Sequence, residues 1–387
     1  MIDKNLGYYL CDGIEFGSKI QACLHSVKVN KPIKWVFLNS FFEGNDWKTE
    51  PVETLDTLYN QRSRQIREKY DYVILSYSGG ADSHNILMSF IRQGLHIDEI
   101  IVNTMTKGNS QFTVVDTRVK TPEHAASEHE LQTIPRLKEV ENLIPKTKIT
   151  ILDLSDHLFS SLTTAKDASW VLDKREGLNP LGATRFNYIH FTDVRKQFDK
   201  DKKIALVLGI EKPRTWISSD DNLYIRFTDR ATNLVTVAEY YQEYTNSRVE
   251  YFYWNKESLR LLTKQAHVIK HWLEAFPQYQ HLWRGKNVTP EVFRIVHERL
   301  LRSLLYTTWN DTWFQSDKAT KDWYSEFDDW FIKGHEGSQA HNIWREGLDF
   351  VETNLTPYIK KDKTGQSDGL TSISYDYLVG RINTLKD

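Results

Sequence analysis

The chain has 387 residues, of which 40% are hydrophobic and 26% are charged. This balance is typical of a folded globular protein and excludes an intrinsically disordered chain, and the length is enough for two or three structural units. The formal net charge of −2 argues against strong general binding to nucleic acid, because such binding needs a basic surface. No apolar run approaches the length of a membrane span, so we expect no membrane partner.

The two cysteines, Cys11 and Cys23, are too few for a disulfide framework or for a cysteine-rich zinc site. The first five residues also lack the pattern of a secretory signal. Both observations predict a cytoplasmic protein.

The first 69 residues are predicted to form a segment that packs on the core of the protein. Residues 33–38 alternate well enough to predict a strand. Pro51 stands where a helix can begin, and apolar residues then recur at helical spacing up to Lys69. We therefore expect a helix over residues 51–69.

Residues 70–255 alternate between strand and helix patterns, and we expect them to form the central domain. The predicted strands cover residues 72–77, 99–104, 148–154, 203–209 and 223–227. Pro135 must break or bend the mostly helical stretch between the second and third of these strands. Strands and helices that alternate at this spacing form right-handed crossovers. The sequence therefore predicts an α/β fold with a mainly parallel, doubly wound sheet.

After about residue 255 the strand patterns stop, and residues 256–387 are predicted to form a helical, tryptophan-rich C-terminal domain. One helix is expected over residues 256–276, and a second begins near Thr289. The tryptophans that follow recur at helical intervals, and we expect them to pack in the core rather than to stack on bases. Residues 360–369 are predicted to form a loop, and residues 373–382 a short ordered segment.

The sequence SGGADS at residues 78–83 joins the first strand of the central domain to a predicted helix. Paired glycines let the backbone come close to a ligand. The N-terminus of a helix presents unpaired N–H groups together with the positive end of the helix dipole. The turn is therefore a predicted anion site, and phosphate is the expected ligand.

This hexapeptide resembles the SGGxDS phosphate-binding loop, or PP-loop, of the N-type ATP pyrophosphatase superfamily. Its members cleave ATP to AMP and pyrophosphate while they adenylate a substrate. The resemblance implies a HUP-like (adenine nucleotide alpha hydrolase-like) sheet, with ATP and Mg²⁺ as ligands. It assigns ATP binding to Ser76, Ser78, Gly79, Gly80, Ala81, Asp82 and Ser83. Asp82 is the expected Mg²⁺ ligand and a catalytic residue, because a carboxylate beside phosphate needs a bridging cation.

A second loop, at residues 208–214, directly follows the fourth predicted strand. Gly209 permits close approach of the backbone, and Lys212 and Arg214 supply positive charge for phosphate. The loop is similar to the glycine-plus-lysine loop of the superfamily, which implies catalytic roles for both cations. The superfamily pattern also implies that Asn103 and Thr104, at the end of the second strand, form the adenine site.

Missing cysteines help to separate the branches of the superfamily. Sulfur-transferring members and relatives of phosphoadenylylsulfate reductase use catalytic cysteines, and 7-cyano-7-deazaguanine synthases carry a cysteine zinc site. No cysteine follows the loop in this chain, and Ile2 stands where glutamine-dependent members have a cysteine nucleophile. The overall layout resembles uncharacterised PP-loop proteins of bacteriophages, which implies the cytoplasm of a host cell.

The sequence thus predicts an enzyme that adenylates an acceptor oxygen, releases pyrophosphate and lets a nitrogen nucleophile displace AMP. The expected acceptor is a nucleobase, a tRNA base or a small acid. Two alternatives stay open. One is an enzyme of the 7-cyano-7-deazaguanine synthase or sulfur-transfer type, and the other is an inactive ATP-binding sensor or scaffold. A homodimer also stays open.

His267 and His271 are four residues apart within the predicted helix 256–276. That spacing places two imidazoles on one face of a helix, where they can hold zinc. No third ligand is evident nearby in the sequence, and helix surfaces often carry such a pair without a metal. We therefore expect no metal there.

Overall fold

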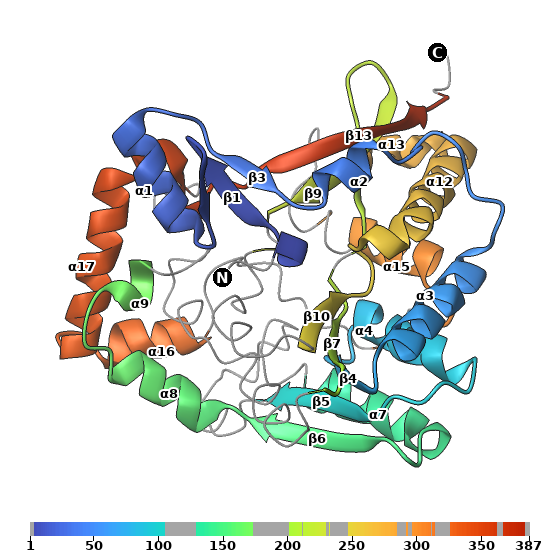
Figure 1. Cartoon of the computed structure of the whole chain (residues 1–387), viewed down its shortest axis with the longest axis horizontal. Coiled ribbons are helices and arrows are strands. Elements are labelled where there is room, and N and C mark those ends of the chain that lie inside the picture. Colours follow the sequence, from blue (N-terminus) through green and yellow to red (C-terminus); the bar gives the residue numbers. More distant parts are fainter. Residues whose placement is uncertain are drawn as a thin grey trace.

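A computed structural model describes residues 4–104, 129–172, 201–210, 212–229, 232, 247–284, 292, 296–310, 312–313, 326–361 and 367–383. Its central feature is a parallel sheet of five strands with flanking helices (Figure 1). The strands are β4 (Tyr72–Ser76), β5 (Glu99–Thr104), β6 (Lys148–Asp153), β7 (Ile204–Leu208) and β10 (Ser247–Tyr251). Their spatial order is β10-β7-β4-β5-β6. The predicted α/β class is confirmed, and so is the presence of a helical region.

The inner strands of this sheet are apolar because both of their faces are covered by the rest of the chain. Residues 73–75 of β4 and all of β7 are buried, as is typical of strands in parallel sheets. The register pairs Val73 with Ala205 and Leu75 with Ile100. Strand β6, by contrast, lies at one edge and has no fully buried residue.

Helix α3 (Leu55–Lys69) packs against α4 (Ala81–Ile91), and α12 (Leu259–Ala275) packs on α3. Helix α3 begins at Leu55 because the hydroxyl of Thr54 caps it, accepting a hydrogen bond from the amide of Thr57 at 3.2 Å. Pro51 lies before the helix, so the prediction that the helix begins there is wrong.

A second, antiparallel sheet has the order β13-β9-β8. Its strands are β8 (Arg214–Ile217), β9 (Asn222–Thr228) and β13 (Ser374–Arg381). The predicted strand at 223–227 therefore exists as β9 but lies outside the parallel sheet, where β10 takes the fifth place. The reason is a tight turn in which the Ser218 amide donates to the Asn222 carbonyl at 2.9 Å and reverses the chain. The expectation that strands end near residue 255 is also wrong, because β13 pairs with β9.

Two smaller sheets use the ends of the chain. The first has the order β2-β1-β3 and is antiparallel. It contains β1 (Tyr8–Cys11), β2 (Ile14–Phe16) and β3 (Lys34–Val36), and β3 confirms the strand predicted at residues 33–38. The other is the pair β11 (Ile359–Lys361) and β12 (Ser367–Leu370).

The remaining helices lie around these sheets (Figure 1). They are α1 (Lys19–Val29), α2 (Asn39–Glu43), α7 (Ile134–Val140), α8 (Ser155–Thr163), α9 (Ser169–Leu172), α13 (Gln280–Trp283), α15 (Glu298–Leu305), α16 (Glu326–Gly334) and α17 (Gln339–Asn354). Short helical turns are η1 (Lys4–Leu6), η2 (His129–Thr133), η3 (Glu141–Leu143), η6 (Lys256–Ser258), η7 (Pro277–Tyr279) and η10 (Thr356–Tyr358). Pro135 lies in the first turn of α7, directly after η2, where its missing N–H removes no hydrogen bond from α7. Within the described parts of the chain, no helix is both long and apolar enough to cross a lipid bilayer.

Two hydrophobic clusters hold these elements together. The larger contains buried residues from the N-terminal 69 residues, the parallel sheet and the C-terminal region alike. The smaller gathers around α1, α9 and α17, at the left of Figure 1. Trp309 packs against the larger cluster and Trp344 is buried in the smaller one, which agrees with the predicted packing role, whereas Trp323 lies outside the described residues.

A buried ion pair joins α3 to the edge strand β10. Arg62 Nη2 lies 2.6 Å from Glu250 Oε1, and the two side chains are 2% and 4% exposed. Arg62 also donates to the carbonyl oxygens of Tyr251 and Phe252, at 3.0 and 3.2 Å. Burial alone would raise the pKa of Glu250, but Arg62 and the hydroxyl of Tyr70 hold that pKa below its usual value. This carboxylate therefore depends on its partners to remain charged inside the protein.

The substitution Arg62→Met should lower the free energy of unfolding by roughly 3–5 kcal/mol, because it leaves Glu250 buried without its main partner. Urea unfolding followed by circular dichroism measures the change. Arg64→Met is the matched control, since Arg64 lies on the exposed side of the same helix, and it should change stability by less than about 0.5 kcal/mol. Equal effects of the two substitutions would contradict a structural role for the buried pair.

Candidate functional site

The loop after β4 makes a sharp turn into α4. Gly79 has a φ of +67°, a left-handed conformation that favours glycine. A Cβ atom at Gly79 would also lie 2.7 Å from Thr133 Cα, so the loop packs directly on the backbone of η2. Gly80 precedes the first residue of α4, and no described side chain caps this helix. The first turn of α4 thus keeps the amide groups that suit an anion.

Hydrogen bonds among its own residues fix the shape of this loop. Ser83 Oγ lies 3.3 Å from both the amide nitrogen and the Oγ of Ser78. The Gly80 amide donates to Ser78 Oγ at 3.2 Å. From outside the loop, Gln132 and Thr133 both donate to the Ser78 carbonyl, at 3.0 and 2.6 Å. Ser78 and Ser83, two of the three serines predicted to bind ATP, therefore converge on one turn.

The structure brings the second predicted loop against the first. Strand β7 lies next to β4 in the sheet, and Gly209 follows its last residue. A Cβ atom at Gly209 would lie 3.2 Å from the Ser83 nitrogen and 3.3 Å from the Asp82 carbonyl carbon. The absence of a side chain at Gly209 therefore lets this strand end approach the first turn of α4.

Lys212 joins the two loops electrostatically. Its Nζ lies 3.9 Å from Asp82 Oδ2 and 3.0 Å from Glu298 Oε2 at the start of α15. Burial alone would raise the pKa of Glu298, but the charge of Lys212 outweighs it and holds that pKa below its usual value. Arg214, the other predicted cation, opens β8 and is exposed, where the register pairs it with Arg226 of β9.

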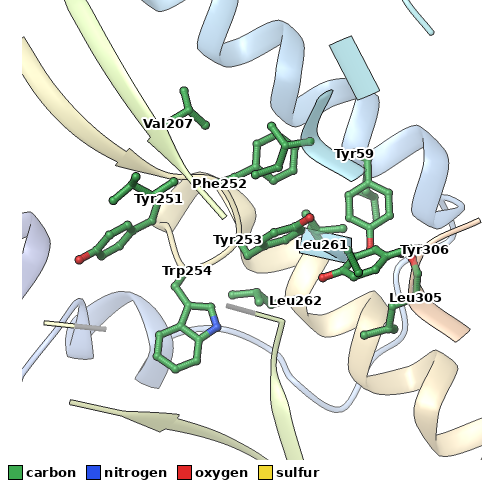
Figure 2. Close-up of a cluster of buried hydrophobic side chains, with 14 of the residues drawn as sticks. Tyr59, Val207, Tyr251, Phe252, Tyr253, Trp254, Leu261, Leu262, Leu305 and Tyr306 are labelled. Carbon is green, nitrogen blue, oxygen red and sulfur yellow. Dashed lines mark hydrogen bonds between the residues drawn. The ribbon is translucent and has the colours of Figure 1, made fainter. Parts of the chain in front are cut away.

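Two tyrosines from distant parts of the chain hold Asp82. The Tyr306 hydroxyl donates to Asp82 Oδ1, and the Tyr253 hydroxyl donates to the Asp82 carbonyl at 2.9 Å. Figure 2 shows both rings gathered with Tyr59 in the buried cluster beside α12. Burial and the nearby Asp82 carboxylate raise the pKa of Tyr306 far above its ordinary value, so this hydroxyl stays protonated and keeps donating.

Sequence reasoning assigned no site role to Tyr253, Glu298 or Tyr306. The two tyrosines lie 171 and 224 positions from Asp82 along the chain, and no local spacing links residues so far apart. Tyr253 does belong to an aromatic run that directly follows β10. Strand β10 is parallel to β7, and β7 to β4, so the end of β10 reaches the same edge of the sheet. The sequence predicts no strand over residues 247–251, so this placement comes from the tertiary structure.

The predicted adenine-site residues lie at the end of β5, next to the loop. Ser76, at the end of β4, pairs with Ile101 of that strand. Asn103 is exposed, whereas Thr104 is 5% exposed. Within the described part of the chain, Thr104 Oγ1 is a buried oxygen without a hydrogen-bond partner. A buried hydroxyl without a partner is suited to hydrogen-bonding with a ligand, because leaving the hydroxyl unpaired costs free energy.

A buried histidine lies in the second turn of the helix that follows the loop. His84 Nδ1 is 2.9 Å from the Tyr77 hydroxyl, and the ring packs edge-on against Trp313. The guanidinium of Arg136 lies over the same tryptophan, 5.0 Å from its ring centre. Burial, together with the charge of Arg136, lowers the pKa of His84 to about 4. The imidazole is therefore neutral at pH 7.

This low pKa predicts a pH dependence of stability. Between about pH 6.5 and pH 4 the unfolded chain binds a proton at His84 that the folded chain does not, so folding stability falls by up to about 3 kcal/mol as the pH drops. His84→Gln should remove this part of the fall. Urea unfolding at pH 7 and pH 4.5 measures it, with the exposed His96→Gln as control. The same pH dependence in His84→Gln as in the wild type would refute the assignment.

The chain matches no model of a known protein family, and it matches no curated protein sequence.

Proposed function

We propose that the chain is an ATP pyrophosphatase that binds ATP with Mg²⁺ at residues 78–83 and adenylates an acceptor oxygen. The observation that carries the proposal is the meeting of three features at one edge of the sheet. These are the left-handed Gly79 turn, the uncapped first turn of α4, and the Lys212 ammonium group beside Asp82. Together they offer amides and one cation to phosphate, and a carboxylate to Mg²⁺.

The strand order supports this location. From β4 the chain adds β5 and β6 on one side, and then crosses to β7 and β10 on the other side. The direction thus reverses between β4 and β7, and both loops leave the sheet at that point. Ligands of open parallel sheets bind at such reversals, at the carboxyl ends of the strands. The same order is compatible with the HUP-like architecture that the PP-loop resemblance implies.

In this proposal the two ends of ATP contact different strands. The β- and γ-phosphates lie against the amides of the loop, the hydroxyls of Ser78 and Ser83, and Lys212. Asp82 would hold Mg²⁺, which would neutralise the charge that develops on the pyrophosphate. The nucleoside end lies toward β5, where the unpartnered hydroxyl of Thr104 supports a polar contact.

The proposed reaction has two steps. An oxygen of the acceptor attacks the α-phosphorus of ATP, the bond from that phosphorus to the bridging oxygen breaks, and pyrophosphate leaves with the electron pair. A nitrogen nucleophile then attacks the activated carbon of the acceptor, and AMP leaves with the electron pair of the carbon–oxygen bond. The chain's own contribution is positioning and charge neutralisation. A nucleobase, a tRNA base or a small acid is the proposed acceptor class.

Asp82→Ala should abolish the gain in affinity that Mg²⁺ gives to a non-hydrolysable ATP analogue, measured by isothermal titration calorimetry. It should also lower pyrophosphate release from labelled ATP by about 100-fold or more. Asp376→Ala is the matched control. The Asp376 carboxylate is about as exposed as that of Asp82, it is also paired with a cation, and it lies far from Asp82 along the chain. Circular dichroism checks that both variants are folded.

Two results would contradict this function. One is a wild-type protein that does not bind the analogue, and the other is ADP in place of AMP as the product. Binding of ATP without cleavage, in the presence of small-molecule and tRNA extracts, would instead support a nucleotide-binding sensor or scaffold.

Lys212→Ala should weaken binding of the analogue by about tenfold or more, because a charge-assisted contact to phosphate is lost. Lys203→Ala is the control. Lys203 is exposed and directly precedes β7, at the end of that strand opposite to Gly209, so this variant should bind the analogue as the wild type does. Unchanged affinity in Lys212→Ala would remove this residue from the site while leaving the role of Asp82 to be judged separately.

A further inference from the structure

Helix α12 and the segment before α3 bring together three metal-binding side chains that lie outside the proposed ATP site. They are Glu50, His267 and His271, and one potential ligand atom of each lies within 4.8 Å of the others. The two histidines are one turn apart on α12, and Glu50 lies 221 positions before His271 in the chain. The third ligand that the sequence does not reveal is therefore supplied by tertiary packing.

The surroundings of His267 favour a metal-binding tautomer. His267 is 5% exposed, and its Nε2 lies 3.1 Å from the backbone carbonyl oxygen of Trp47. A carbonyl oxygen can only accept a hydrogen bond, so Nε2 carries the hydrogen and Nδ1 keeps the lone pair. Histidines that bind metals commonly donate their second N–H to a backbone carbonyl in this way.

Glu50 is oriented by two partners, one for each oxygen. Its Oε1 lies 2.6 Å from Lys264 Nζ, and its Oε2 lies 2.7 Å from His271 Nε2. Lys264 also donates to the Pro51 carbonyl at 3.1 Å, which ties this segment to α12. The lysine thus occupies one carboxylate oxygen and leaves the other directed toward the histidines.

We propose that Glu50, His267 and His271 bind one Zn²⁺ ion. Two imidazoles and one carboxylate form a donor set that zinc accepts, with water as the fourth ligand. Zinc–ligand distances of about 2 Å require the ligand atoms to lie no more than about 4 Å apart. Binding therefore requires the most widely separated ligand atoms to move slightly closer, while the ion replaces the direct contact between Glu50 Oε2 and His271 Nε2. The ion then fastens the segment before α3 to α12.

Calorimetric titration of the EDTA-treated full chain with ZnCl₂ tests this site. The wild type should bind one ion, and the ion should raise the midpoint of thermal unfolding. His271→Ala and Glu50→Gln should each weaken zinc binding at least tenfold and remove the thermal shift. Both side chains are partly exposed, 56% and 31%, so the variants are expected to fold. MgCl₂ should not shift the unfolding midpoint of the wild type or of either variant, because Mg²⁺ prefers sites built of oxygen ligands alone.

His96→Ala is the matched control, because His96 is an exposed histidine beside a carboxylate and lies outside the cluster. It should bind zinc as the wild type does. Wild-type affinity in His271→Ala would overturn the proposal, and so would an equal loss in His96→Ala.

Discussion

The carboxylate of Glu250 is the constraint on which the candidate site depends. A charge buried this deeply must be met by partners, and Arg62, Tyr70 and Asn255 all hydrogen-bond to it. Arg62 also donates to the carbonyl oxygens of Tyr251, the last residue of β10, and of Phe252, the residue after it. The chain beyond β10 is thus fixed against α3, and Tyr253 reaches the backbone of Asp82 from that position.

The ends of the chain complete the core rather than extend from it. Strand β13 pairs with β9, and the Tyr375 hydroxyl donates to the Trp35 carbonyl near the other end of the chain. Lys19 forms an ion pair with Asp229 at 2.7 Å, and both side chains are almost fully buried. Residues from the first 69 positions and from beyond position 255 therefore share one hydrophobic cluster with the parallel sheet.

The C-terminal region contributes directly to the candidate site. Glu298, at the start of α15, lies against Lys212, and Tyr306, just after this helix, donates to Asp82. The carboxylate and the ammonium group that the proposed function uses are therefore both held by residues from outside the central sheet. A change in the packing of α15 would reach both groups at once, since the two contacts come from the two ends of one helix.

The sequence by itself determined four strands of the parallel sheet and the two loops that meet at its edge. Apolar runs at 72–76 and 204–208 and the glycines at 79 and 209 are local signals, because burial on both faces and left-handed or close-packed backbone each demand particular residue types. The fifth parallel strand, the cap at Thr54 and the pairing of β13 with β9 were decided by tertiary structure. So were the contacts of Tyr253, Glu298 and Tyr306 at the loop, and the approach of Glu50 to the histidines of α12. These contacts join residues far apart in the chain, and their energies depend on burial and charge that no short stretch of sequence contains.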